Sequence, residues 1–78
     1  MKIYKAKVKW NGNHYSAGET VKGSKLIHDK EKNEWLIFDD EPIPDFPFYG
    51  EGRDEYVEID YDTLEELEVH EKDWYYWK

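Results

Sequence analysis

The chain of 78 residues is long enough for one small domain, 1–78, and its 4 Trp, 7 Tyr and 3 Phe residues favour a folded chain over a disordered one. Eleven Lys and Arg residues against 19 Asp and Glu give a net charge of −8, which argues against a surface built to grip nucleic-acid phosphates. The absence of cysteine excludes disulfides, thiolate zinc sites and cysteine nucleophiles.

Period-two alternation predicts a strand at the start of the chain. Residues 2–10 place apolar side chains on one face and lysines on the other, which is typical of a half-buried strand. The apolar face holds Tyr4, Ala6, Val8 and Trp10. Asn11-Gly12 then predicts a tight turn, because both central residues of such a turn need positive φ.

Two further strands are predicted before the middle of the chain. The stretch from Thr20 to His28 reads as a strand, and Gly23 inside it predicts a bulge or a sharp bend. Residues 29–33 are charged and predict a hairpin loop. Residues 34–38 have the length and composition of a strand, which we expect to be buried on both faces and central in the sheet.

Residues 39–54 predict an acidic, proline-rich loop. They contain all three prolines of the chain and six acids, and proline cannot donate a hydrogen bond to a ladder. Such a long irregular stretch in a compact domain is often functional. The alternative is that its apolar side chains cap an open end of the core; these are Ile43, Phe46, Phe48 and Tyr49.

The last third of the chain has two interpretations. Residues 55–59 alternate like a strand, after which Asp62, with an acid three residues on, fits a helix N-cap and predicts one short helical turn at 62–67. The alternative continues the strand through 67–69, and a terminal strand is expected through 74–77. The fold class predicted is mainly β or a small α+β fold. It would be a compact antiparallel sheet or a partly open barrel of four to five strands with one short helical turn.

The residue pattern predicts no enzyme, no catalytic residue, no cofactor and no metal. The histidines occur singly, as His14, His28 and His70, without the spacing of metal ligands. The stretch 60–65 begins like a calcium loop but lacks the glycine that such a loop needs. With 19 acids no carboxylate pair stands out for acid–base chemistry. A small domain also has little room for a pocket of roughly 300 Å³.

The charge is distributed unevenly along the chain. Residues 1–32 carry 8 basic and 3 acidic side chains, and residues 33–78 carry 3 basic and 16 acidic ones, so the two net charges are +5 and −13. Such asymmetry indicates an interaction surface. The alternative is that the halves neutralise each other across the sheet, where exposed ion pairs contribute about 0–1 kcal/mol each.

The leading hypothesis is a small non-catalytic binding protein whose acidic second half engages a basic partner protein, as a nucleic-acid mimic in a binding groove would. Aromatic side chains would add contact area, since Trp and Tyr are frequent in interface hot spots. The candidate partner-binding residues are Asp39, Asp40, Glu41, Asp45, Phe46, Phe48, Tyr49, Glu51, Asp54, Glu65, Glu66, Glu68, Trp74 and Trp77. The alternative is a self-associating module in which the lysine face pairs with the acidic half of another copy.

The same composition sets expectations for partners and location. We expect no direct nucleic-acid binding and no membrane contact, because no apolar run approaches the roughly 20 residues of a membrane span. No charged and then apolar leader is visible, so a cytoplasmic location is expected. Either a monomer or a homodimer fits the sequence.

Four short motifs follow one another along the chain: Trp10-Asn11-Gly12, Val21-Lys22-Gly23-Ser24 with Leu26-Ile27, Trp35-Leu36-Ile37, and Val57-Glu58-Ile59-Asp60 continuing to Thr63-Leu64. This pattern resembles the amino-terminal part of the YopX-like proteins of phages and prophages, which show a similar W-V-x-G-S-L/I strand and a later V-D-x-x-T-V segment. The resemblance covers fragments of residues 10–64. The glycine- and aspartate-rich second half of that family is not found here, and the acidic proline loop is an insertion. The resemblance implies a phage or mobile-element accessory protein with no assigned catalytic residues.

Overall fold

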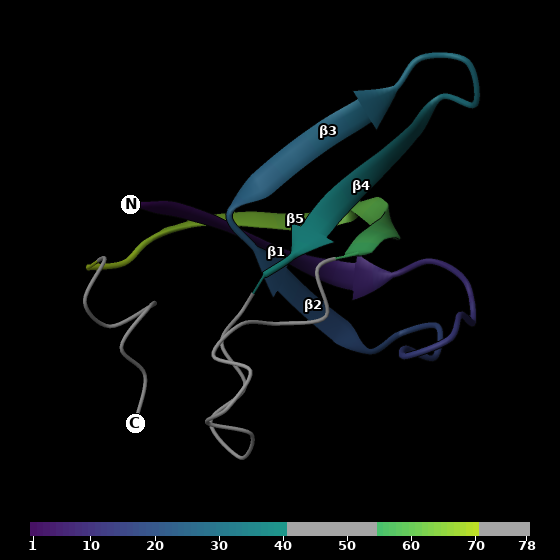
Figure 1. The fold of residues 1–78 in the computed structure, drawn as a ribbon, viewed down its shortest axis with the longest axis horizontal. Helices are drawn as coiled ribbons and strands as arrows, with labels where there is room; N and C mark the ends of the chain where they lie inside the picture. The colour runs from purple at the N-terminus through teal and green to yellow at the C-terminus, as the bar shows by residue number, and fades with distance from the viewer. Residues whose placement is uncertain (41–54, 71–78) are drawn as a thin grey trace.

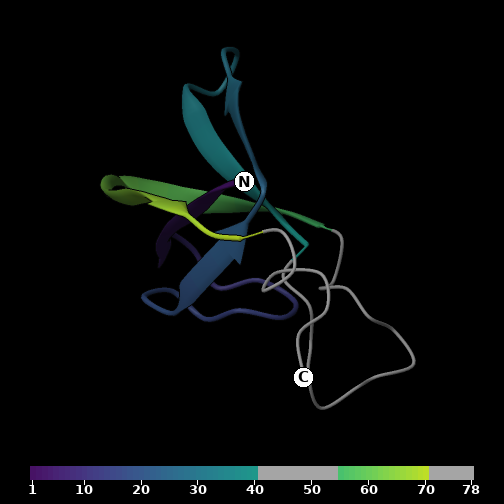
Figure 2. The same cartoon turned by 90° about the vertical axis from the view of Figure 1, so that its left-hand side faces the viewer.

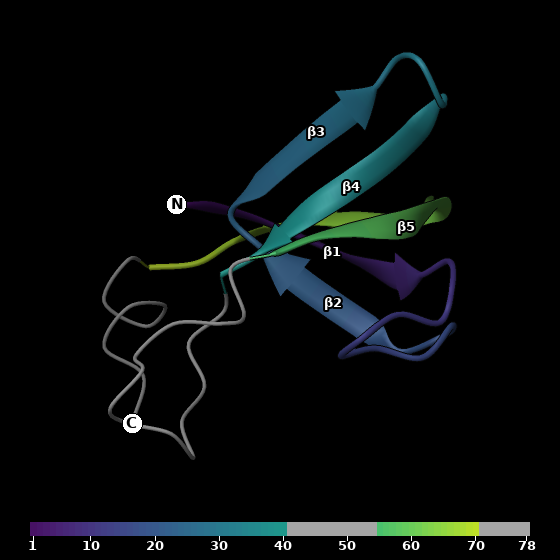
Figure 3. The same cartoon turned by 45° about the vertical axis from the view of Figure 1, so that its right-hand side comes forward.

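This computed structural model describes residues 1–40 and 55–70. These residues form five antiparallel strands joined by loops, and no helix. The strands are β1 (Lys2–Val8), β2 (Thr20–Gly23), β3 (Lys25–Asp29), β4 (Glu34–Asp39) and β5 (Glu55–Glu68). They form one sheet in the order β2-β1-β5-β4-β3 (Figure 1). Figure 3 shows this order from bottom to top, with β5 in the middle. The predicted small antiparallel β fold is confirmed.

A bend between β2 and β3 curls the sheet. These two strands lie at opposite edges of the sheet but are separated in the chain only by Ser24. A Cβ atom on Gly23 would lie 1.7 Å from the carbonyl oxygen of Phe38, so the close approach of β2 to β4 requires glycine. Figure 2 shows β2 and β3 leaving the bend in different directions. The bend predicted at Gly23 is confirmed, and no ladder between described residues closes the sheet.

Asp40 holds this bend in place. Its carboxylate accepts a hydrogen bond from the backbone N–H of Ser24 at 2.8 Å and a second one from the Ser24 hydroxyl. The Asp40 side chain is buried, so these bonds replace the water that a carboxylate otherwise needs. An acid that the sequence places in a charged run therefore has a structural role.

The helical turn predicted at 62–67 is wrong, because β5 continues as a strand through that region. β1 pairs with the second half of β5, with Ile3 opposite Leu67 and Lys5 opposite Glu65. This ladder satisfies the backbone groups that a helix would have satisfied internally. The alternative interpretation, a continuing strand, is correct through Glu68.

A bulge lies at the start of the segment in which Asp62 suggested a helix cap. The register between β1 and β5 shifts between Lys5 and Lys7, and Lys7 lies opposite Asp60. The Asp60 carboxylate accepts from the backbone N–H of Asp62 at 3.2 Å, and its carbonyl accepts from the Thr63 hydroxyl at 2.7 Å. The Thr63 oxygen in turn accepts from the backbone N–H of Lys7 at 2.8 Å. These three hydrogen bonds hold the bulge together.

The core lies on one face of the curled sheet. Its buried apolar side chains are Ala6, Val8, Val21, Ile37, Val57 and Ile59, and Ile3 is buried outside this cluster. The central strand is β5 rather than β4, which corrects the expectation for residues 34–38. β4 is not buried on both faces either, since Leu36 and Phe38 remain partly exposed on the side opposite Ile37.

The loop between β1 and β2 is wider than the sequence predicts. Among the described residues, positive φ occurs at Gly18, with 90°, and at Asn33, with 54°, and not at Asn11 or Gly12. The backbone N–H of Gly12 donates to the carbonyl of Tyr15 at 2.8 Å. The Asn-Gly pair therefore lies in an eleven-residue connection instead of a tight turn. The charged hairpin loop predicted at residues 29–33 is confirmed.

The proline-rich loop predicted at 39–54 lies outside the described residues except for Asp39 and Asp40, and the terminal strand predicted at 74–77 lies outside them as well. Within 1–40 and 55–70 there is no helix that is long and apolar enough to cross a membrane.

Candidate functional site: an aromatic and acidic surface

The face of the sheet opposite the core carries apolar and acidic side chains together. Side chains alternate between the faces of a strand, and Ile37 and Val57 point into the core, so their even-numbered neighbours point outward. On this outer face Phe38 lies opposite Tyr56, their ring centroids 4.9 Å apart. Tyr56 is 51% exposed. A large aromatic ring exposed to this extent marks a candidate contact surface.

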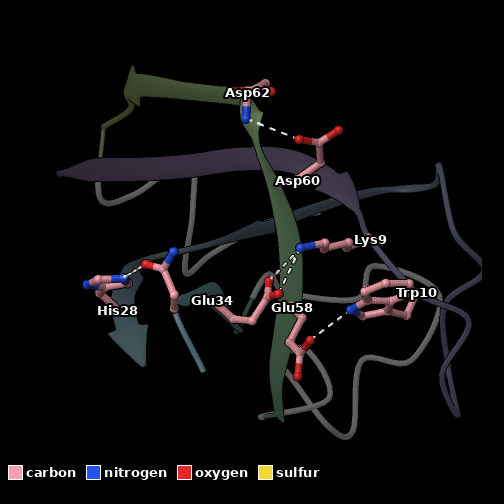
Figure 4. A network of polar contacts seen from close by, with 8 residues as sticks. Lys9, Trp10, His28, Glu34, Glu58, Asp60 and Asp62 are labelled. Atoms are coloured by element: carbon pink, nitrogen blue, oxygen red, sulfur yellow. Dashed lines mark hydrogen bonds and ion pairs between the residues drawn. The ribbon is translucent and has the colours of Figure 1, made fainter. Parts of the chain in front are cut away.

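Trp10 lies beside this outer face, immediately after β1. It was expected to point into the core, but β1 ends at Val8 and the Trp10 side chain is 58% exposed. Its indole Nε1 donates a hydrogen bond to Oε2 of Glu58 at 2.9 Å, as Figure 4 shows. The ring is therefore held in one orientation by β5 while most of it stays in contact with solvent.

Lys9 joins β1 to β4 across this surface. Its Nζ lies 2.7 Å and 3.0 Å from the two carboxylate oxygens of Glu34 (Figure 4). This hydrogen bond raises the pKa of Lys9 above its ordinary value of 10.5, and the charges of Glu34, Glu58 and Asp60 add to the effect against a smaller opposing effect of desolvation. Lys9 is therefore fully charged at neutral pH, and Glu34 neutralises it.

A pocket of about 270 Å³ opens between the first loop and the start of β5. Three aromatic and two acidic residues line it, and we call it the aromatic–acidic pocket. These residues are Trp10, Tyr15, Glu55, Tyr56 and Glu58, and the lining is completed by Val8, Asn11, Gly12, Asn13 and Val57. The combination of π faces with negative charge is typical of a site for a cation.

Two side chains of the pocket, Tyr15 and Glu55, are held in position by contacts with neighbouring residues. The Tyr15 hydroxyl donates to Oδ2 of Asp39 at 2.7 Å, and Asp39 is only 2% exposed. On the other side Nδ1 of His14 lies 3.1 Å from Oε2 of Glu55. Because their positions are fixed in advance, the pocket side chains lose little conformational freedom when a ligand binds.

Five of the fourteen predicted partner-binding residues lie in the described part of the chain, and two of those five are buried. Asp39 and Asp40 form the internal hydrogen bonds given above, so they are not available as surface contacts. The other nine predictions lie outside the described residues: Glu41, Asp45, Phe46, Phe48, Tyr49, Glu51, Asp54, Trp74 and Trp77.

The remaining three predicted contacts are exposed but ion-paired along the ladder between β1 and β5. Glu65 lies 3.6 Å from Nζ of Lys5, Glu66 lies 3.7 Å from Nζ of Lys2, and Glu68 lies 3.5 Å from the N-terminal amine. The basic first half and the acidic second half of the chain are therefore interleaved here. Along this ladder the two halves of the chain neutralise each other, as one of the two interpretations of the charge pattern expects.

A second aromatic cluster lies at the opposite end of β4. The rings of His28 and Trp35 stack with centroids 4.4 Å apart, and those of Trp35 and Tyr61 stack at 4.6 Å. Tyr61 is 50% exposed on the bulge of β5. This cluster joins three strands, but Tyr61 does not line the aromatic–acidic pocket.

The sequence interpretation missed the residues that form the pocket, and two of them could have been found. Tyr56 occupies the face opposite Val57 in an alternating segment, which already places it outside the core. Trp10 directly precedes Asn11-Gly12, a turn signal, and near the end of a strand alternation no longer predicts which face a side chain occupies. Tyr15 and Glu55 gave no such signal, because 40 residues separate them in the chain.

Comparisons of the chain with protein-family models, with curated proteins and with solved structures gave no match. Within residues 1–40 and 55–70, no group of three or more His, Asp or Glu side chains is placed to hold a metal ion. The described surface offers exposed aromatic rings and carboxylates.

Proposed function

We propose that this protein is a non-catalytic binding protein that recognises a partner protein with a basic surface. The observation that supports this is the exposed pair Trp10 and Tyr56, which line one pocket together with Glu58, the carboxylate that Trp10 hydrogen-bonds. Tryptophan and tyrosine supply most of the binding energy in many interfaces, and a carboxylate between them favours Lys or Arg on the partner.

The interleaved charges limit how electrostatics contributes. Because the acids of the second half of β5 already face lysines, we assign the specific contacts to Glu55 and Glu58. The net charge of −8 acts at longer range, by attracting a basic partner. This attraction is screened over about 8 Å at physiological ionic strength, so association should slow as salt is raised.

The resemblance to the YopX-like family supports a biological setting for this function. We propose a phage or mobile-element accessory protein that acts on a host or phage protein. A basic partner surface that normally binds nucleic acid fits this setting, since a negatively charged protein can occupy it in place of phosphates.

Affinity capture with site variants tests the proposed function. The full chain is immobilised, the captured partner is identified and purified, and its dissociation constant is measured for wild type and for Trp10→Ala. We expect the variant to bind about 30-fold more weakly, the loss typical of one hot-spot side chain. The control is Glu66→Gln, which lies at the ladder with β1 and should retain wild-type binding. Equal binding by wild type and Trp10→Ala would remove the proposal.

An apolar strip on the outer face favours a second function, self-association. Ile27 is 41% exposed on the edge strand β3, and it lies opposite Leu36 on β4. A second copy packed on this strip would form a homodimer. Sedimentation over a range of concentrations decides between the two: a dimer that Ile27→Lys dissociates supports self-association, and a monomer at high concentration excludes it.

A further inference from the structure

The aromatic–acidic pocket has a composition that selects for one kind of ligand group. Three aromatic residues and two acidic residues in its lining attract a cation. The volume of about 270 Å³ lies just below the range of pockets that bind drug-sized molecules, so a single side chain fits it better than a nucleotide or a large cofactor.

We propose that this pocket binds the ammonium group of a lysine side chain that the partner protein presents; this inference rests on the proposed function. The alkyl stem of the lysine would lie along the rings of Trp10 and Tyr56, and its ammonium would lie close to Glu55 and Glu58. A lysine stem is apolar and its head is charged, which matches walls made of rings and carboxylates.

The hydrogen bonds of the two carboxylates favour a cation that still carries N–H groups. Within the described residues, Glu58 accepts from Trp10 through Oε2, and Glu55 contacts His14 through Oε2. No hydrogen bond between residues of 1–40 and 55–70 uses the Oε1 atom of either carboxylate, which can accept one from a ligand. Charge-assisted hydrogen bonds of this kind are stronger than neutral ones. A quaternary ammonium has no N–H group to donate to them.

The structure already places one ammonium over a ring of this pocket. Nζ of Lys9 lies 5.3 Å from the ring centroid of Trp10, within the distance at which a cation is attracted to an aromatic face. Glu34 neutralises Lys9, so its charge opposes a second cation only weakly. Trp10 is thus held between Lys9 and Glu58, in an orientation suited to a ligand at the pocket side.

The test is an NMR titration of the full chain with Nα-acetyl-lysine methylamide as the probe. We expect saturable shifts of the Trp10 indole N–H and of the backbone amides of Tyr56 and Val57, with a dissociation constant in the millimolar range. The norleucine analogue has the same stem without the charge and should bind at least about 10-fold more weakly. Equal binding of the norleucine analogue, or shifts that do not saturate, would overturn the inference.

Further probes and variants separate the sources of binding. The trimethyl-lysine analogue should bind more weakly than lysine because it cannot donate to the Oε1 atoms, and tighter binding would contradict the proposed hydrogen bonds. Tyr56→Ala should weaken lysine binding about 10-fold or more, and Tyr61→Ala, an equally exposed tyrosine on the same strand but outside the pocket, should leave it unchanged. Trp10→Phe keeps a ring and the fold but loses the bond to Glu58, so it should show an intermediate affinity.

The two proposals fail in different ways. If the lysine probe does not bind while capture of the partner still depends on Trp10, the lysine pocket is wrong and the binding function stands. If the probe binds in the pocket while the partner is retained by Trp10→Ala, the proposed function is wrong and the pocket stands.

Discussion

Several single residues have structural roles that the residues next to them in the sequence do not indicate. Gly23 is the clearest example, because the backbone of Phe38 occupies the space of its missing Cβ. Asp39 and Asp40 follow the same principle: they read as solvated charge, yet partners 24 and 16 residues earlier in the chain bury them. The glycine could be predicted from its position inside a strand pattern. The buried acids could not, since their partners lie far away in the chain, in the loop between β1 and β2 and at the bend between β2 and β3.

Replacing Gly23 tests the bend. Gly23→Ala places a methyl group against a backbone carbonyl that cannot move aside, so it should lower the free energy of unfolding by about 3 kcal/mol, as severe overpacking does. Urea denaturation followed by circular dichroism measures this. Gly12→Ala is the control: its Cβ would lie 3.9 Å from the nearest atom, and it should stay within about 1 kcal/mol of wild type. Similar losses for both variants would mean that the contact with Phe38 does not set the requirement.

Lys9 gives a prediction for the pH dependence of stability. Because its pKa is raised in the folded state by Glu34, the folded protein holds this proton more tightly than the unfolded chain does. The resulting stability is fully present below pH 10.5 and is lost as the pH rises through the raised pKa.

Thermal unfolding of wild type and Lys9→Met, measured from pH 9 to pH 12, isolates this effect from the titration of the tyrosines. The wild type should lose more stability than the variant between the ordinary and the raised pKa of Lys9. Parallel curves for the two proteins would show that the bond to Glu34 does not contribute in solution.

At the scale of elements, the alternating patterns predicted most strands and the long-range pairing decided the rest. Local apolar spacing predicts β1 and β4. The position of Gly23 predicts the bend between β2 and β3. Local spacing does not predict the second half of β5, because its backbone partners lie in β1, some 60 residues away. The helical turn predicted at 62–67 is wrong, since the ladder with β1 fixes these residues as a strand. For the same reason the outer-face partners of Tyr56 could not be predicted.

Thr63→Val tests whether the bulge in β5 depends on its hydroxyl. The substitution keeps the shape of the side chain but leaves the backbone N–H of Lys7 to water, and it should cost about 1 kcal/mol. Thr20→Val removes a hydroxyl that accepts a hydrogen bond from the exposed Nζ of the same lysine, and it should cost less than about 0.5 kcal/mol. Chemical denaturation compares the two. A cost as small for Thr63 as for Thr20 would show that the bulge does not need this bond.

At the scale of the whole molecule, the strong separation of charge along the sequence is partly cancelled by the fold. β1 and β5 bring lysines and glutamates together, so a sequence split of +5 and −13 does not by itself predict an acidic face. Away from this ladder, exposed aromatic rings and two glutamates line a pocket at one end of the sheet. The proposed partner binding therefore depends on the pocket surface rather than on net charge.

The dissociation constant of the captured partner for Tyr56→Ala, set against that for Tyr61→Ala, tests this claim most directly. Both tyrosines lie on β5 with half of their surface exposed, and Tyr56 alone lines the pocket. The proposed function predicts binding about 30-fold weaker for Tyr56→Ala and within twofold of wild type for Tyr61→Ala. Equal losses, or a loss confined to Tyr61→Ala, would contradict it.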